Sequence, residues 1–244
     1  IENLKQQGFD YIEFSSNPKL RKKLNRIGLE MIGDISWPEH ISINTIPINV
    51  AVKYGINLIF WGENSQNEYG GTEKAANSKE LTWEWLLQYA DFAGLRISDV
   101  EGLYNLEKKD LIPYYYPSAE EIKKAKIQSL FLGYFFPWSG YKNYEYVMKH
   151  GFKTYDKWVE GSYGNYENLD NHQTGIHDYF KFLKFGWSRA TDILSMAIRR
   201  NKISRKDALK IIKERDGKYP ISYLGKPLKK ILSDINMGIE EFDI

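Results

Sequence analysis

The chain of 244 residues is long enough for one large domain, and its 42% hydrophobic residues are enough to build a core. With 34 basic and 32 acidic side chains the formal net charge is only +2, which argues against a nucleic-acid-binding protein. The absence of cysteine excludes disulfide bonds and thiolate metal sites within these residues and fits a reducing cytoplasm. No apolar run approaches the roughly 18 residues of a membrane-spanning helix, so we expect a cytoplasmic globular protein.

The first sixty residues predict an α/β arrangement. We expect a strand at 11–14 and a helix that begins at Asn17-Pro18 and ends near Gly28. A break at 33–40 leads into an apolar segment at 43–54. Next comes the run Leu58–Trp61, which has the length and composition of a strand covered on both faces. Strand, helix, loop, helix and strand in this order predict a right-handed crossover within a parallel sheet.

A polar loop directly follows the second of these strands. It contains two carboxylates, Glu63 and Glu68, several amides and the pair Gly70-Gly71. Ligands of open α/β sheets bind at the carboxyl ends of the strands, which makes this loop the first candidate site. From composition alone, a solvated turn explains the loop equally well.

The loop resembles a known signature. Gly62-Glu63-Asn64 followed by Glu68-Tyr69-Gly70-Gly71 is similar to the signature loop of the N-acetyl sugar amidotransferases, which are PP-loop ATP pyrophosphatases of surface-polysaccharide biosynthesis. A looser likeness, Gly-Glu-x-x-x-x-Glu-x-x-Gly, links it to the synthetase domain of asparagine synthetases. The resemblance implies a partial PP-loop/HUP-like parallel sheet with helices, followed by a mostly helical C-terminal part.

The remainder of the chain predicts helices joined by aromatic loops. We expect helices at 81–89 and 118–127, and a short strand or buried turn at 130–138 that re-enters the core. Without a recognisable linker, we divide the chain into a partial nucleotide-binding domain at 1–75 and a mainly helical part at 76–244 packed on it.

A long helix is expected within 166–200. Apolar side chains from Ile176 to Ala197 recur at alternating steps of four and three, which predicts a core-facing seam interrupted only by Gly186. Cations dominate the other faces. Such a surface suits pyrophosphate or a nucleotide-sugar, although a docked acidic partner explains it too.

A second block of residues resembles the same family. It comprises Asn168-Leu169-Asp170, His177-Asp178-Tyr179, Lys181, Lys184, Gly186, Arg189-Ala190-Thr191-Asp192, Ile198-Arg199 and Ser204-Arg205. An isolated His177 is more often a surface or core histidine, but two blocks in the right order are harder to obtain by chance. The resemblance extends from about Asn3 to about Gly217.

One segment departs from the family pattern. Near Asp34 to His40 the family has cysteines flanking the tryptophan, whereas Ser36 and Glu39 stand there in this sequence. This departure argues against a zinc site at that point.

The resemblance implies an ATP-dependent reaction. The family converts the acetamido group of a nucleotide- or lipid-linked N-acetyl sugar into an acetamidino group in lipopolysaccharide (O-antigen) or other surface-glycan biosynthesis, using ATP, Mg²⁺ and ammonia. Glu63 and Glu68 are the catalytic candidates, and Glu63 is also the candidate Mg²⁺ ligand. The candidates for binding ATP, pyrophosphate or substrate are Gly62, Asn64, Gly70, Gly71, Asp170, His177, Asp178, Lys181, Lys184 and Arg189.

Two expected parts are missing from the sequence. The Ser-Gly-Gly-x-Asp-Ser loop of PP-loop enzymes is absent, and we expect it upstream of Ile1, so that this chain alone binds ATP weakly and is inactive. Because there is no cysteine nucleophile, a separate glutaminase subunit is expected to supply ammonia.

Two other functions remain open at this point. A PP-loop enzyme could adenylate another substrate such as a tRNA base, although the near-balanced charge argues against it. A non-catalytic carbohydrate- or partner-binding module that lost its ATP loop is the second alternative.

The basic residues of the long helix give a geometric expectation. On a regular helix Lys181 and Lys184 lie about 60° apart, and Arg189 lies roughly 140° beyond Lys184. They can therefore share one pocket only if the helix bends or breaks at Gly186.

Overall fold

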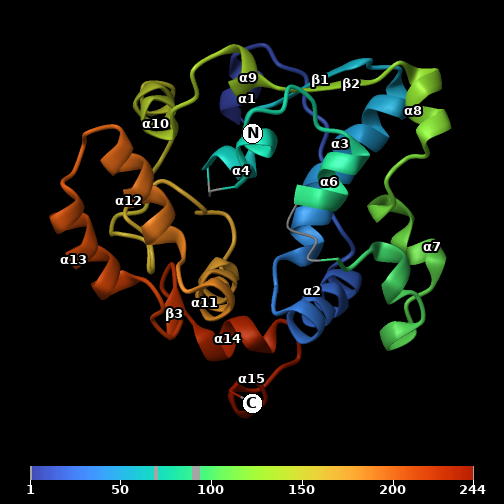
Figure 1. Ribbon diagram of the computed structural model, residues 1–244. Coiled ribbons are helices and arrows are strands. Elements are labelled where there is room, and N and C mark those ends of the chain that lie inside the picture. The colour runs from blue at the N-terminus through green and yellow to red at the C-terminus, as the bar shows by residue number, and fades with distance from the viewer. Residues whose placement is uncertain (1, 69–70, 90–93, 244) are drawn as a thin grey trace.

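The computed structural model describes residues 2–68, 71–89 and 94–243 of an α/β chain with a mostly helical C-terminal part (Figure 1). The α-helices are α1 Glu2–Gln6, α2 Pro18–Ile32, α3 Trp37–Tyr54, α4 Ser65–Glu68, α5 Glu73–Ala76, α6 Trp83–Tyr89, α7 Lys108–Leu111, α8 Ala119–Ala125, α9 Leu132–Phe135, α10 Gly140–Met148, α11 Thr174–Phe185, α12 Arg189–Arg199, α13 Arg205–Arg215, α14 Leu228–Ser233 and α15 Ile239–Phe242. The 3₁₀ turns are η1 Ile97–Val100, η2 Leu103–Asn105 and η3 Ile112–Tyr114, and the strands are β1 Leu58–Trp61, β2 Gln128–Phe131, β3 Ser222–Tyr223 and β4 Lys226–Pro227. Within these described ranges no helix is long and apolar enough to cross a membrane.

The sheet that positions the candidate loop is a parallel pair. β1 aligns with β2 so that Leu58 lies opposite Gln128 and Trp61 opposite Phe131. The strand expected at 58–61 is therefore confirmed, as is the α/β class. β3 and β4 form a separate antiparallel pair near the C-terminus.

Two expectations about the strands are wrong. β1 is not covered on both faces, because Leu58 and Phe60 are 43% and 53% exposed and β2 is its only strand neighbour among the described residues. Residues 11–14 form no strand. In the described structure no strand pairs with them, so their backbone lacks the ladder hydrogen bonds that would hold an extended segment, and their side chains are exposed.

A glycine allows a close approach at the corner between α2 and α3. Asn17 caps α2 as expected, its side chain accepting the Lys19 N–H at 2.9 Å, but the helix continues past Gly28 to Ile32. A Cβ on Gly28 would lie 2.5 Å from the Asp34 carbonyl oxygen and 2.8 Å from Trp37 Cβ. Gly28 therefore permits a close contact and, contrary to expectation, does not end the helix. The following helix, α3, begins at Trp37 and not at residue 43, where the apolar segment was expected to start.

Two hydrophobic cores meet at this corner. The first contains Leu24, Ile27 and Trp37 and extends through α6 to β2, and the indole N–H of Trp37 donates to the Leu95 carbonyl at 3.2 Å. The second contains Leu29 and Ile35 from the same corner and extends through α11 to α14. The first core contains residues from both sides of position 75, where we expected the boundary between the two parts of the chain. The second core consists largely of residues from the C-terminal helices.

Gly186 divides the long helix into α11 and α12, as its position predicts. Gly186 has φ +81° and its N–H bonds the Phe182 carbonyl, which ends α11 in a left-handed cap. The apolar seam is buried at Ile176, Ala190 and Leu194. Leu183 and Trp187, which flank the break, are 58% and 41% exposed, so the continuous seam is wrong at that point.

The aromatic segment after β2 also differs from expectation. Phe131 is 2% exposed, but Tyr134 and Phe136 in and after α9 are 55% and 63% exposed. The segment therefore leaves the core after one strand instead of re-entering it.

Gly28→Ala should lower the free energy of unfolding by about 1–3 kcal/mol, because the added methyl group cannot fit between α2 and the corner without shifting backbone. Gly140→Ala is the matched control, since a Cβ there meets nothing within 4 Å at the start of α10. Urea unfolding midpoints of the two variants measure the difference. Equal midpoints would show that the corner has room to relax.

Candidate functional site

The loop after β1 is built around Asn64, which is only 7% exposed. Its side-chain oxygen accepts the Gln66 N–H at 3.1 Å, and its amide nitrogen donates to the Ala76 carbonyl at 3.2 Å. The Glu68 carboxylate accepts the Asn64 N–H at 3.2 Å and closes the turn. Asn64 and Glu68 thus fix the backbone that presents the exposed side chain of Glu63.

The glycines of this loop allow close packing. A Cβ on Gly62 would approach the Trp138 ring to 3.3 Å, so the start of the loop lies against the segment that precedes α10. A Cβ on Gly71 would lie 2.1 Å from the Gln66 side-chain oxygen. The third candidate glycine, Gly70, lies outside the described residues.

A group of acidic side chains couples this loop to the C-terminal helices. It consists of Glu63, Glu68, Glu167, Asp178 and Asp192, and we refer to it as the carboxylate cluster. In Figure 1, α4 lies on the side of α3 that faces α11 and α12, from which the aspartates come. The two halves of the sequence signature therefore lie close enough for their charges to interact, although about a hundred residues separate them.

The pKa of Glu68 is raised to about 7. Burial is the largest cause, and the negative charges of Glu63 and Glu167 add to it, while the Asn64 N–H opposes them. Burial likewise raises the pKa of Glu167, with Arg189 opposing the shift and Glu63 adding to it. Carboxylates with raised pKa values that face one another are typical of sites that bind a cation or exchange a proton.

Two ion pairs hold the cluster from the helical side. The Arg189 guanidinium binds Asp178 through two hydrogen bonds, Nε to Oδ2 at 2.8 Å and Nη2 to Oδ1 at 2.9 Å, and both side chains are buried. Lys181 forms an ion pair with Asp192. Each pair joins α11 to α12, which is possible because the helix breaks at Gly186.

The other candidates lie apart from the cluster or on its edge. Lys184 is exposed and donates to the Ile32 carbonyl at 3.2 Å. Asp170 is exposed in the segment before α11. His177 turns toward Asp34, with its Nδ1 at 2.8 Å from Asp34 Oδ1.

Asp34 is the centre of a second group. His40 Nδ1 lies 3.1 Å from its other oxygen, and the His40 and His177 rings are 5.2 Å apart at 78°. Burial alone would raise the pKa of Asp34, but the adjacent imidazoles of His177 and His40 outweigh it and hold that pKa far below its usual range. One ligand atom from each of the three residues lies within 4.8 Å of the others, which is close enough to hold one metal ion.

Sequence reasoning missed Glu167, Asp192 and Asp34 as site residues. Glu167 directly precedes the Asn168-Leu169-Asp170 block, which is the one local signal available, and its Oε2 is buried without a hydrogen-bond partner in the described structure. Asp34 and His177 are 143 positions apart, so no local pattern could join them.

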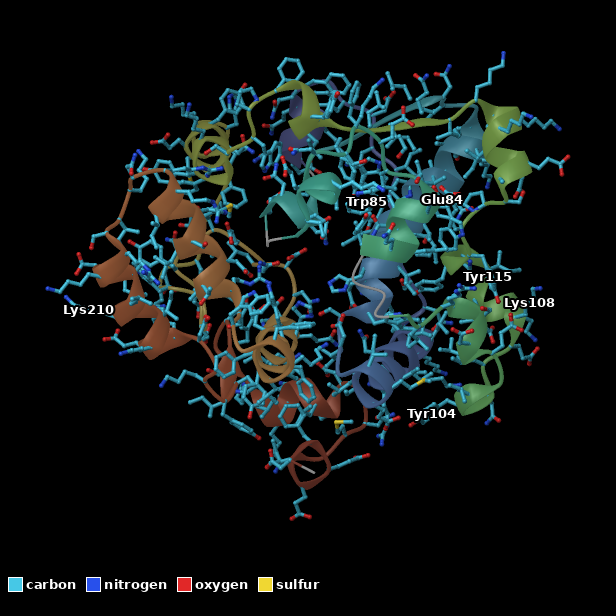
Figure 2. The ribbon with its side chains drawn as sticks, viewed as in Figure 1. Glu84, Trp85, Tyr104, Lys108, Tyr115 and Lys210 are labelled. Carbon is cyan, nitrogen blue, oxygen red and sulfur yellow. The ribbon has the colours of Figure 1, made fainter. Side chains whose placement is uncertain are left out.

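Asp178→Ala should lower the free energy of unfolding by about 3–5 kcal/mol, because it removes a bidentate partner from a buried guanidinium. The control is Lys210→Ala on α13, whose exposed side chain points into solvent and pairs with Asp207 (Figure 2). That change should cost less than about 1 kcal/mol. Similar losses in the two variants would contradict a strong buried pair.

Glu68 should make stability fall as the pH rises. Its folded pKa of about 7 lies above the usual 4.5, so the native state holds the proton more tightly than the unfolded state. The stabilisation that the folded protein gains from this tighter proton binding is complete below pH 4.5 and is lost as the pH rises to 7. Glu68→Gln should flatten this decline, since the amide still accepts the Asn64 N–H without titrating.

The measurement is the urea midpoint of both proteins across this pH range. Glu120→Gln, on the exposed first turn of α8, should keep the wild-type slope. An unchanged slope in Glu68→Gln would locate the titrating group elsewhere.

The C-terminal part of the chain is similar in sequence to a known protein family. Residues 139–243 match the family described as LPS biosynthesis protein WbpG-like, C-terminal domain. No curated protein matches the chain. The matched segment contains Glu167, Asp178 and Arg189, whereas Glu63 and Glu68 precede it. The part of the chain that supplies the helical side of the carboxylate cluster is therefore similar to a domain of lipopolysaccharide biosynthesis proteins.

Proposed function

We propose that the protein is an ATP-dependent amidotransferase of lipopolysaccharide biosynthesis, which converts the acetamido group of a nucleotide-linked N-acetyl sugar into an acetamidino group. The observation that supports it is the carboxylate cluster. Glu63 and Glu68 at the carboxyl end of a parallel strand are coupled to Glu167 in the segment similar to a lipopolysaccharide biosynthesis domain. This is the edge of an α/β sheet at which ligands bind.

The reaction must turn an unreactive amide into an electrophile. The amide oxygen attacks the α-phosphorus of ATP, and pyrophosphate leaves. Ammonia then adds to the imidate carbon, the carbon–oxygen bond breaks, and the oxygen departs with AMP. Overall, one ATP and one ammonia give the amidine, AMP and pyrophosphate.

The cluster offers a proton acceptor for the second step. A general base works best when its pKa lies near the operating pH, and Glu68 has a pKa of about 7. Its backbone hydrogen bond to Asn64 fixes its orientation within the loop. We therefore assign Glu68 the removal of a proton from the attacking ammonia.

The same side chains suit Mg²⁺. Magnesium prefers carboxylate oxygens, and the buried Oε2 of Glu167, which makes no hydrogen bond in the described residues, is an acceptor that lacks a partner. Glu63, exposed beside it, would share the ion with substrate phosphates. When bound, Mg²⁺ neutralises the charge that develops on pyrophosphate.

Arg189 and Lys181 supply the positive charge that the protein itself contributes. Both are held at the cluster by aspartates, which keeps them charged and oriented before substrate arrives. Arg189 also acts electrostatically on Glu167, so its charge reaches the proposed ion site. We propose that these two cations, and not the distant Lys184, face the phosphates.

The direct test is mass spectrometry of UDP-N-acetyl sugars incubated with the full-length protein, ATP, Mg²⁺ and ammonium. We expect the mass change that replacing O by NH produces, together with AMP. Ammonium replaces the ammonia that a separate glutaminase would supply. ATP hydrolysis without any amidine, for every sugar tested, would contradict the proposal.

Glu63→Gln should abolish amidine formation without loss of thermal stability, because it removes a charge from an exposed side chain and preserves its volume. We expect a loss of at least about 100-fold in turnover, as for removal of an acid–base or charge-stabilising group. Glu120→Gln on α8 is the matched control and should retain wild-type turnover. Wild-type turnover of Glu63→Gln at normal stability would remove Glu63 from the mechanism.

A further inference from the structure

We propose that Asp34, His40 and His177 bind a divalent first-row transition-metal ion, with Zn²⁺ as the probe of choice. The lack of cysteines near Asp34 to His40 argues against a zinc site from the sequence alone, but the folded chain adds His177 to Asp34 and His40. The site is separate from the carboxylate cluster in its residues and its chemistry, and it does not depend on the proposed amidotransferase activity. The three side chains come from the α2–α3 corner, the first turn of α3 and the first turn of α11.

The geometry is close to that of a metal site. Each imidazole directs Nδ1 at a different oxygen of the same carboxylate, at 2.8 Å for His177 and 3.1 Å for His40. Ligands at about 2.0–2.1 Å from a tetrahedral ion are roughly 3.3 Å from one another. The two nitrogen–oxygen distances are therefore within about 0.5 Å of those expected around a zinc ion.

The central ligand is held in place by the fold. Asp34 is 4% exposed, and its Oδ1 accepts the Ser36 N–H at 2.9 Å. Ligating carboxylates in metalloproteins are commonly oriented by such hydrogen bonds. The histidine side chains remain 22% and 20% exposed, which leaves a path by which an ion and water can enter.

The donor set selects the class of ion. Two imidazole nitrogens and one carboxylate suit zinc, iron, cobalt or nickel, whereas Mg²⁺ and Ca²⁺ prefer oxygen ligands alone. Three protein ligands leave at least one position for water. One ion here would link the corner shared by the two cores to α11, across 143 positions of sequence.

The competing explanation is a metal-free cluster in which both imidazoles donate hydrogen bonds to Asp34. This arrangement also satisfies the carboxylate. The two differ in a measurable way, because a hydrogen-bonded cluster gains no stability from added zinc.

The test uses the untagged full-length protein, stripped with a chelator and titrated with Zn²⁺ by calorimetry. We expect one ion per chain and a rise in the thermal midpoint on binding. His40→Gln and His177→Gln should each weaken binding by at least about tenfold and lose the thermal shift. His150→Gln is the matched control, since His150 is exposed and lies outside the group. Mg²⁺ in place of Zn²⁺ should cause no comparable shift.

A second measurement covers the case in which a histidine variant fails to fold. Co²⁺ bound to the wild-type protein should give visible bands typical of nitrogen and oxygen ligands, and X-ray absorption of the zinc form should show imidazole scattering. Zinc binding of equal strength in wild type, His40→Gln and His177→Gln, or no binding by wild type, would overturn the proposal. Neither measurement uses amidine formation as its readout, so failure of the metal site and failure of the proposed reaction are told apart.

Discussion

The close approach of α2 to the α2–α3 corner at Gly28 is the constraint on which the other parts depend. Because no side chain separates Gly28 from the Asp34 carbonyl and Trp37, one short corner supplies Ile27 and Trp37 to the first core and Leu29 and Ile35 to the second. Packing densities in such interiors leave no space for an added methyl group. The parallel strands rest on the first core and the helices α11 and α14 on the second, so this corner sets the distance across which the candidate loop and the C-terminal helices can meet.

The charges of the carboxylate cluster determine which ligands can bind between the candidate loop and the C-terminal helices. The carboxylate cluster has five acidic side chains and two adjoining cations, Lys181 and Arg189, and each cation is paired with an aspartate. The unpaired remainder is Glu63, Glu68 and Glu167, which repel one another, and that repulsion together with burial raises the pKa values of Glu68 and Glu167. A divalent cation relieves this repulsion and a phosphate alone does not. The arrangement therefore favours a metal–phosphate ligand over a free anion, which modifies the expectation that the basic helix face binds phosphates directly.

Local signals in the sequence were sufficient for much of the fold. The Asn17 cap, the Ser118–Glu121 capping box, the strand at 58–61 and the break at Gly186 depend on residues within a few positions of one another. What could not be predicted depends on partners remote in sequence. Tyr11–Phe14 has strand character but no strand beside it, and Leu58 is exposed because burial depends on what covers a face and not on the strand's own composition. For the same reason the motif pointed to the loop, whereas the contact of Asp34 with His177 and the interaction of Glu167 with Glu63 join residues more than a hundred positions apart.

Helix α11 shows how one element can serve two sites of different chemistry. His177 and Asp178 are consecutive, and successive side chains on an α-helix diverge by about 100°, so the first turns to Asp34 and the second to Arg189. One direction leads to the nitrogen and oxygen donors of the Asp34 group, and the other to the buried Asp178–Arg189 ion pair. Because both contacts are made from adjacent positions of one helix, a shift of α11 moves His177 and Asp178 together. An ion between Asp34 and His177 would therefore fix the position of Asp178, and through it that of Arg189, relative to the loop at Glu63.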